Sequence, residues 1–274
     1  VRQTAKYLYI IYFALTMIEV IFLLFGGMNL FEALTTSFGT AGTGGFAIWN
    51  DGFVSVSPYN QWVVTIFMLL FGVNFGFYFL ILTGKLRDAL KFEEVRIYFI
   101  IVIAAAVFIF INLRHFALYA PAEGIRQAFF QVASIITTTG FASADFNLWP
   151  ETSRTILVLL MFIGACAGST GGGIKVSRFI IACKSFIKEI ISYLHPRSVK
   201  KIKIEVKPLE HETLRATNVY FMTYMVIFAV SVLLVSIENK DLVTNFAAVA
   251  ATFNNIWLDR WRISDILRIL RNIF

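Results

Sequence analysis

Two short stretches of glycine and threonine contain the residues of this chain best suited to binding an ion. The first, TGGF, runs from Thr43 to Phe46, and the second, TTTGF, runs from Thr137 to Phe141. Glycine at this density is a poor helix former, because each interior glycine costs about 1 kcal/mol relative to alanine. Both stretches nevertheless lie among apolar segments of membrane length, where irregular backbone is tolerated only if it is buried in protein or lines a watery cavity. The pattern predicts that they line an ion path.

The chemistry expected of these stretches is coordination of a cation by oxygen atoms. Successive backbone carbonyls can point the same way only if some residues adopt φ > 0, which glycine does at no steric cost. Carbonyls of this kind replace the water shell of the ion in potassium filters, and threonine adds a hydroxyl oxygen at low volume. Two parts of a candidate filter follow, at Thr43, Gly44, Gly45, Thr138, Thr139 and Gly140. The alternative is that small residues merely let helices pack closely; the recurrence of both stretches at one point of a repeat favours the filter.

The composition places these stretches in a membrane. The 274 residues are 58% hydrophobic and 15% charged, with a mean hydropathy of +0.74, whereas soluble domains contain about 25% charged residues. The net charge of +7 falls between apolar segments, which indicates cytoplasmic loops beside lipid rather than a nucleic-acid partner. Two cysteines and three widely spaced histidines indicate neither a disulfide framework nor a metal cluster.

The elements that must position these stretches recur along the chain. Apolar runs of spanning length, about 20 residues, cover residues 7–27, 61–82, 95–113, 155–187 and 216–237. Segments too short to span, suited to re-entrant half-helices, cover residues 30–38, 124–136 and 242–253. Aligning TGGF with TTGF places Gly45 on Gly140 and gives a repeat of about 95 residues. The predicted fold is an all-α polytopic membrane protein built of repeated span–pore-helix–span units with re-entrant loops.

This pattern divides the chain into expected units. The first unit covers residues 1–92 and the second covers residues 93–194. Residues 195–256 combine a basic loop with a partial third unit, and residues 257–274 form a basic amphipathic segment suited to an interface.

Charge predicts one orientation for these units. Residues 28–60 contain no lysine or arginine, whereas residues 85–96 and 184–215 are rich in both. Because positively charged loops face the cytoplasm, the short segments should enter the membrane from outside. A half-helix ending within the membrane directs its carboxyl end, equivalent to about half a negative charge, at whatever lies beyond it. Such an end favours a cation.

Three acidic residues near these elements allow two interpretations each. Glu19 interrupts the first span, and an intramembrane carboxylate is either functional or paired with a polar group of a neighbouring helix. Asp51 and Asp145 follow the two candidate filter stretches by a few residues. They either gather cations at the outer mouth or cap local turns.

A glycine-rich break, GACAGSTGGGIK, interrupts the long run at residues 164–175. It should unwind the helix about halfway across the membrane. Its polar and flexible residues are Gly168, Ser169, Thr170, Gly171, Gly172, Gly173 and Lys175. A phosphate-binding P-loop is excluded, because the sequence lacks the adjacent Gly-Lys pair and a strand–helix context. A flexible kink with Lys175 extending to the cytoplasmic surface remains the alternative to a functional loop.

Read together, GTAGTGGF, TTTGF and GSTGGGIK resemble the membrane subunit of the Trk/Ktr/HKT superfamily of potassium transporters, most closely the bacterial Trk type. The resemblance covers about residues 1–256 and implies four span–pore–span units around one pore. It implies one filter glycine per unit, matched by Gly45 and Gly140, and a third filter position at Asn254 and Asn255. It also implies that the break at 164–175 is an intramembrane gating loop.

The same resemblance implies the setting in which the protein works. It implies a multi-pass protein of the bacterial inner membrane, surrounded by membrane lipid, that transports K⁺ and uses no cofactor. It further implies a homodimer controlled by a cytoplasmic nucleotide-binding regulatory subunit. No clustered catalytic residues accompany the break, so the chain is not expected to be an enzyme.

The sequence departs from the family pattern at both ends. A first unit is expected before Val1, and the third copy reaches Asn255 without the glycine of its filter. The chain alone is therefore expected not to close a four-part pore. The alternative function is a non-conducting membrane scaffold, or a truncated fragment that associates with complete subunits.

Overall fold

The structure, a computed structural model, is described for residues 2–195, 203–204, 207–209 and 211–256. Its helices are α1 (Arg2–Phe25), α2 (Leu30–Ala41), α3 (Pro58–Phe71), α4 (Phe75–Leu82), α5 (Leu86–Ala89), α6 (Glu93–His115), α7 (Pro121–Ile136), α8 (Glu151–Ile163), α9 (Val176–Leu194), α10 (His211–Val235) and α11 (Leu242–Phe253). Short 3₁₀ turns occur at η1 (Phe146–Leu148) and η2 (Ser236–Glu238), and β1 (Lys203–Ile204) pairs antiparallel with β2 (Lys207–Pro208). The all-α prediction is confirmed apart from this small hairpin. The amphipathic segment expected at 257–274 lies outside the described residues.

Long apolar helices give the fold its membrane character. Within the described residues, three stretches are long and apolar enough to cross a membrane, at Lys6–Phe25, Glu93–His115 and His211–Glu238. Their side chains facing away from the protein are largely apolar and exposed, as lipid contact requires.

The run at 61–82, expected as one span, is instead two helices. The axes of α3 and α4 differ by 88° across a break of three residues. Gly72 ends α3, and the Asn74 side chain accepts a hydrogen bond from the Gly76 N–H (2.8 Å), which starts α4 in a new direction. An Asn N-cap of this kind satisfies an amide that the bend leaves without a helical partner.

Short helices lie where the sequence predicts re-entrant segments. At the start of α2, Asn29 and Glu32 form a reciprocal capping box, and Asp241 caps α11 by accepting from the Thr244 N–H at 3.0 Å. Pro121 occupies the first turn of α7, where its missing N–H costs nothing. The helices α2 and α7 are slightly longer than predicted, and α11 has the predicted bounds.

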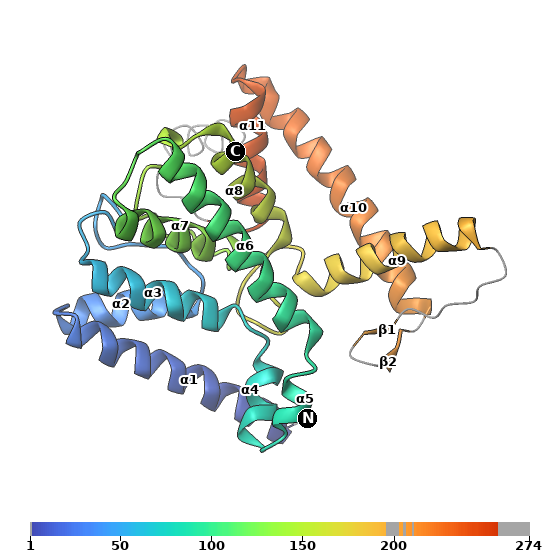
Figure 1. The fold of residues 1–274 in the computed structure, drawn as a ribbon, viewed down its shortest axis with the longest axis horizontal. Coiled ribbons are helices and arrows are strands. Elements are labelled where there is room, and N and C mark those ends of the chain that lie inside the picture. The colour runs from blue at the N-terminus through green and yellow to red at the C-terminus, as the bar shows by residue number, and fades with distance from the viewer. Residues whose placement is uncertain (1, 196–202, 205–206, 210, 257–274) are drawn as a thin grey trace.

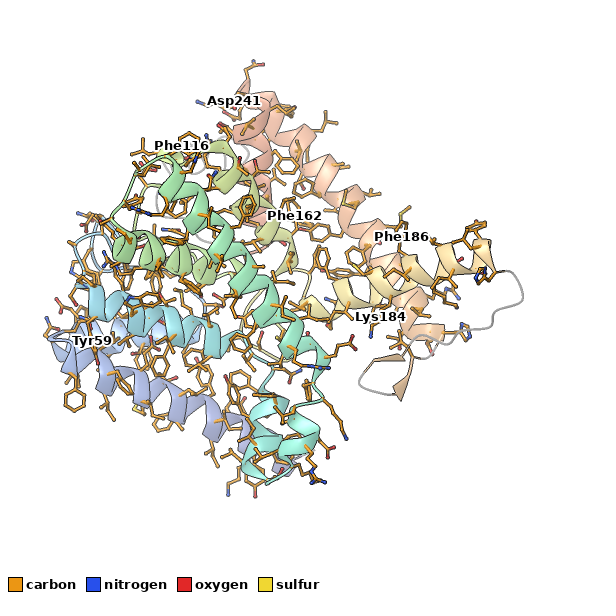
Figure 2. All side chains as sticks on the ribbon, viewed as in Figure 1. Tyr59, Phe116, Phe162, Lys184, Phe186 and Asp241 are labelled. Carbon is orange, nitrogen blue, oxygen red and sulfur yellow. The ribbon has the colours of Figure 1, made fainter. Side chains whose placement is uncertain are left out.

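Helices far apart in sequence pack around these short helices (Figure 1). The helices α1, α2 and α3 form one group, α6, α7 and α8 form a second, and α3 joins the two by packing on α7. On the other side, Phe162 of α8 (Figure 2) contacts the rings of Phe228 on α10 (5.3 Å between centroids) and Phe246 on α11 (5.9 Å). The helix α9 leaves this body beside α10, where Arg178 lies over the Tyr220 ring at 4.1 Å.

Candidate functional site

One helix-end geometry occurs at the carboxyl ends of α2, α7 and α11. In each, the second residue after the helix adopts the left-handed conformation, at Thr43 (φ 49°), Thr138 (φ 59°) and Asn255 (φ 57°). A non-glycine residue in this conformation costs roughly 1–2 kcal/mol. The same conformation follows α6 at Ala117 (φ 52°), so it describes how these helices end and does not by itself mark a filter.

The hydrogen bonds of the three ends are also the same. The left-handed residue donates its N–H three residues back, to Thr40 O (3.1 Å), Ile135 O (3.0 Å) and Thr252 O (3.1 Å). The next residue donates five residues back, to Gly39 O (2.8 Å), Ser134 O (2.9 Å) and Ala251 O (2.8 Å). This pair of bonds is the Schellman motif, which satisfies the last carbonyls of a helix and turns the chain sharply.

The first two turns lie side by side. A Cβ added at Gly45 would overlap the carbonyl oxygen of Thr139 and lie 3.2 Å from the Cα of Gly140. Beyond the turns, the Phe53 N–H donates to the Ala142 carbonyl at 2.7 Å. Gly45 and Gly140 have φ of 70° and 90°, as the filter assignment requires of its glycines.

The third turn superposes on the others with an offset from the sequence assignment. Asn254 corresponds to Gly42 and Thr137, because it directly follows its helix, and Asn255 corresponds to Thr43 and Thr138. The Asn254 side chain is buried and accepts from the Tyr224 hydroxyl at 2.9 Å. The position equivalent to Gly45 and Gly140 is residue 257, which lies outside the described residues.

The predicted break is present at its predicted bounds, since α8 ends at Ile163 and α9 begins at Val176. This break loop, residues 164–175, contacts all three turns. The Thr43 hydroxyl donates to the Thr170 carbonyl (3.3 Å), and the Gly172 N–H donates to the Thr138 hydroxyl (2.5 Å). A Cβ at Gly172 would lie 2.9 Å from the Asn254 carbonyl oxygen. The loop therefore lies directly against the candidate filter turns.

Short-range bonds hold the break loop in its irregular path. Gly168 and Gly173 have positive φ, and so does Lys175, at 80°. The Ser169 hydroxyl donates to the Cys166 carbonyl (2.6 Å), and the Lys175 ammonium donates to the Gly171 carbonyl. Lys175 thus folds back onto the loop instead of extending to the cytoplasmic surface.

Sequence reasoning missed a second break that supports the first. The Cys166 N–H donates to the Gly72 carbonyl and the Phe75 N–H donates to the Gly168 carbonyl, both at 3.0 Å. The bend between α3 and α4 therefore exchanges backbone hydrogen bonds with the break loop. The available signal was Gly72 with Asn74 inside an otherwise apolar run, a pairing that is unfavourable in a helix interior.

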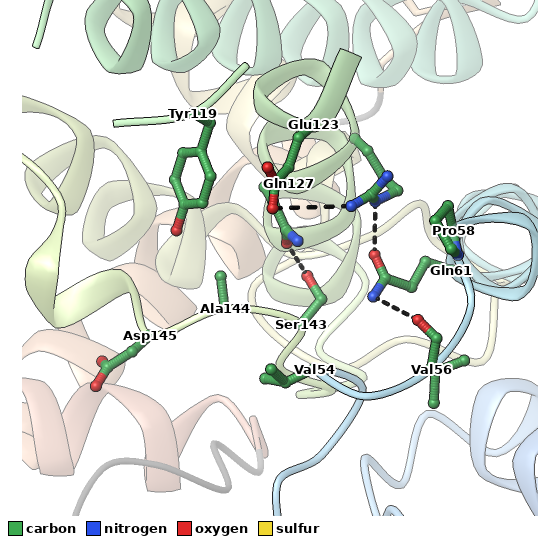
Figure 3. Close-up of a pocket in the computed structure, with 11 residues that line it drawn as sticks. Val54, Val56, Pro58, Gln61, Tyr119, Glu123, Gln127, Ser143, Ala144 and Asp145 are labelled. Atoms are coloured by element: carbon green, nitrogen blue, oxygen red, sulfur yellow. Dashed lines mark hydrogen bonds and ion pairs between the residues drawn. The ribbon is translucent and has the colours of Figure 1, made fainter. Parts of the chain in front are cut away.

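A polar pocket of about 330 Å³ lies beyond the turns, on the side predicted to face outward (Figure 3). Arg126 of α7 donates to the Gln61 side chain at 2.8 Å, and Gln61 donates in turn to the Val56 carbonyl at 3.0 Å. Asp145 lines the pocket and accepts from the Asn147 N–H at 3.1 Å. This bond fits the turn-capping interpretation of Asp145, while its place on the pocket wall also suits an outer mouth.

Glu19 is fully buried in α1, near the Thr40 hydroxyl of α2. Neither of its carboxyl oxygens has a hydrogen-bond partner, and the Thr40 hydroxyl donates to the Thr36 carbonyl (2.9 Å). Ser37, one turn earlier on α2, also has a buried hydroxyl without a partner. Glu19 therefore lies near a polar group of a neighbouring helix without a hydrogen bond to it, and the choice between the functional and the paired interpretation stays a prediction.

Membrane-length helices combined with short helices that end in sharp turns define a polytopic helical membrane protein. A model of the TrkH family, described as cation transport proteins, matches residues 1–259. The chain belongs to this family. Membership confirms the resemblance to the membrane subunit of the bacterial Trk type, and the helices of membrane length agree with a multi-pass protein of the inner membrane.

Individual relatives agree with this placement. The Trk system potassium uptake protein TrkH of Escherichia coli K12 is 36% identical over 264 residues, covering 93% of this chain and 54% of the relative. The related TrkG of the same strain is 27% identical over 276 residues, covering 99% and 56%. The crystal structure of the potassium transporter TrkH from Vibrio parahaemolyticus superposes with a TM-score of 0.89 at 30% identity, covering 98% of this chain and 61% of that one. The chain spans about half the length of the curated relatives it matches.

Proposed function

We propose that this chain forms part of the wall of a pore that carries potassium ions across the bacterial inner membrane. The observation that supports this best is that the turns after α2, α7 and α11 all lie against the break loop, through Thr43, Thr138 and Asn254. The relatives named as potassium uptake proteins support K⁺ as the ion.

The proposed filter consists of the turns themselves. Its oxygen ligands are the carbonyls and hydroxyls of Thr43, Gly44, Gly45, Thr138, Thr139 and Gly140, with Asn254 and Asn255 in the third turn. Each short helix adds about half a negative charge at its carboxyl end, and the turns contain no lysine or arginine. The electrostatic field at the turns therefore favours a cation, and closely spaced carbonyls favour one that gives up its water.

The break loop is the proposed gate. Its residues Gly168, Ser169, Thr170, Gly171, Gly172 and Gly173 lie between the filter turns and α9, with Lys175 at its end. Two of these residues support this role, because Thr170 and Gly172 each form a hydrogen bond with one of the proposed filter turns. A loop in this position obstructs the ion path in one conformation and clears it in another, and glycines give it the freedom to do so.

The complete protein is proposed to act as a homodimer in lipid, under a cytoplasmic nucleotide-binding regulatory subunit. The support is the family resemblance, together with the relatives' names as components of Trk systems. The basic segment around the β1–β2 hairpin, on the predicted cytoplasmic side, offers positive charge to an acidic partner surface or to anionic lipid.

The test is K⁺ uptake by the intact gene in cells that lack their own potassium uptake systems. Gly140→Ala should abolish uptake or admit Na⁺, because alanine is strained at a φ of 90°. Gly124→Ala is the control, on the helix α7 that precedes Gly140, where an added Cβ meets the Phe110 ring and the Tyr119 Cβ at ordinary distances of 3.4 and 3.6 Å. Unchanged K⁺ selectivity in Gly140→Ala would refute the filter, and an intact protein that conducts nothing would favour the non-conducting scaffold.

A further inference from the structure

The break loop and the bend between α3 and α4 form one hydrogen-bonded unit. Besides the bonds of Cys166 and Phe75, the Thr170 hydroxyl donates to the Phe71 carbonyl at 3.3 Å. These bonds fix the first half of the loop. In the second half, Gly172 bonds to Thr138, and where the chain re-enters a helix the Val176 N–H donates to the Ala165 carbonyl at 3.0 Å.

One buried carboxylate joins the two halves. Glu94, in the first turn of α6, is 5% exposed, and its Oε1 accepts from the Ala167 N–H (2.6 Å) and from the Ser177 N–H (3.0 Å). Its Oε2 accepts from the Asn74 side chain at 3.5 Å. A single side chain thus contacts both ends of the break loop and the bend between α3 and α4.

The bond to Ser177 serves as a helix cap supplied by another helix. The first N–H groups of a helix have no partner within it, and the N-cap residue Lys175 makes no side-chain capping bond. A carboxylate at a helix amino end is also favoured by the helix dipole. Hydrogen bonds to a charged acceptor are roughly twice as strong as neutral ones, so Glu94 should fix the start of α9.

The preceding residue connects the same turn to the far part of α9. Glu93 forms an ion pair with Lys184 (2.6 Å), a residue of α9 labelled in Figure 2. Both side chains of this pair are partly exposed, and within the described residues Glu93 makes no side-chain hydrogen bond to the break loop. Glu93 therefore provides a carboxylate on the same helical turn that binds α9 without binding the loop.

We propose that Glu94 is the positioning residue that holds the break loop against the filter turns, and that movement of the loop requires release of its bonds to Ala167 and Ser177. This inference rests on the proposed gating role of the loop. It assigns the closed position of the loop to one buried carboxylate that touches neither the ion nor the turns.

Two measurements on the full-length protein test this proposal. The first is the labelling rate of Cys166, a fully buried thiol within the break loop, by a thiol reagent in a background where Cys183 and any other cysteine is replaced. Glu94→Gln keeps the shape of the side chain but removes its charge. It also places an NH₂ group opposite the NH₂ group of Asn74, so that two donors face each other. Labelling should accelerate by at least about tenfold. Glu93→Gln, the matched control, should label like the parent.

The second measurement is basal cation flux in the same variants. Glu94→Gln and Glu94→Ala should raise it with K⁺ selectivity unchanged, and Glu94→Asp should restore part of the parent behaviour. An unchanged Cys166 labelling rate in Glu94→Gln overturns the positioning role, whatever the flux. Faster labelling with unchanged flux supports the positioning role and refutes the gating function of the loop. If Glu94→Ala does not fold, the Gln variant decides alone.

Discussion

Two adjacent glycines of the first turn should respond very differently to the same substitution. Gly45 has a φ of 70°, and its Cβ position is occupied by the Thr139 carbonyl oxygen. Gly44 has no positive φ, and an added Cβ there meets the exposed Phe46 ring at 3.2 Å and the Gly39 carbonyl oxygen at an ordinary 3.9 Å. Its carbonyl remains in place after substitution by alanine.

The expected magnitudes follow from these contacts. In Gly45→Ala, the left-handed backbone costs roughly 1–2 kcal/mol, and displacing the backbone at Thr139 and Gly140 adds a strain of about 1–3 kcal/mol. Because the obstacle is backbone of the second turn, the strain can relax only by moving filter oxygens. In Gly44→Ala, rotation of one ring relieves the contact, and the cost should stay below about 1 kcal/mol.

The assay is K⁺ and Na⁺ flux by the full-length protein in both variants, with the amount of folded protein measured in parallel. Gly45→Ala should lose at least about tenfold in K⁺ flux, since about 1.4 kcal/mol corresponds to a factor of ten, or should lose its preference for K⁺ over Na⁺. Gly44→Ala should stay within about twofold of the parent. Equal effects of the two substitutions, or normal flux and selectivity in Gly45→Ala, would refute the reasoning.

Three further predictions concern the break loop, Asp241 and Glu19. Deleting one glycine from Gly171–Gly173 should raise basal flux by pulling the loop from the turns, and unchanged flux would argue against a gate there. Hydrogen bonds from the Thr244 hydroxyl and N–H lower the pKa of Asp241 in the folded state. Its carboxylate therefore stabilises the fold at every pH above the pKa of the unfolded state. This contribution disappears as the pH falls through the lower pKa of the folded state. Asp241→Asn, an equally good cap, should remove this pH dependence of the melting temperature below about pH 4. A variant whose melting temperature falls with acid in the same way as that of the parent would contradict the prediction. Glu19→Gln should leave the free energy of unfolding unchanged or raise it by up to about 1 kcal/mol, because it replaces an unpartnered buried carboxyl with a neutral amide, and a loss above about 2 kcal/mol in denaturant unfolding would show that Glu19 is needed.

Local sequence patterns were sufficient to predict the short helices and the break. The half-helix at 242–253 is predicted from its apolar length alone, and the structure begins and ends α11 there. The break at 164–175 is predicted from glycine density, which lowers helix propensity regardless of tertiary contacts. The candidate filter residues Gly45 and Gly140 have the positive φ that their role requires.

Contacts between distant segments could not be predicted in the same way. The bond from Glu94 to Ser177 joins residues that are far apart in the sequence, and no local pattern marks Glu94 as different from Glu93. The bend at Gly72 was not predicted, because the apolar run that contains α3 and α4 has the length and composition of one span. Its geometry depends on hydrogen bonds to the break loop, which a single-segment pattern does not contain.

The central claim is that the turns after α2, α7 and α11 form the wall of a potassium pore. Its most direct test is the K⁺ flux of the full-length protein reconstituted in lipid vesicles, compared with a Gly45→Ala/Gly140→Ala double variant of equal folded yield. The parent should pass K⁺ well above empty vesicles, and the double variant should lose either that flux or its preference for K⁺ over Na⁺. A folded parent that passes no K⁺, or a double variant with the parent's flux and selectivity, would contradict the claim.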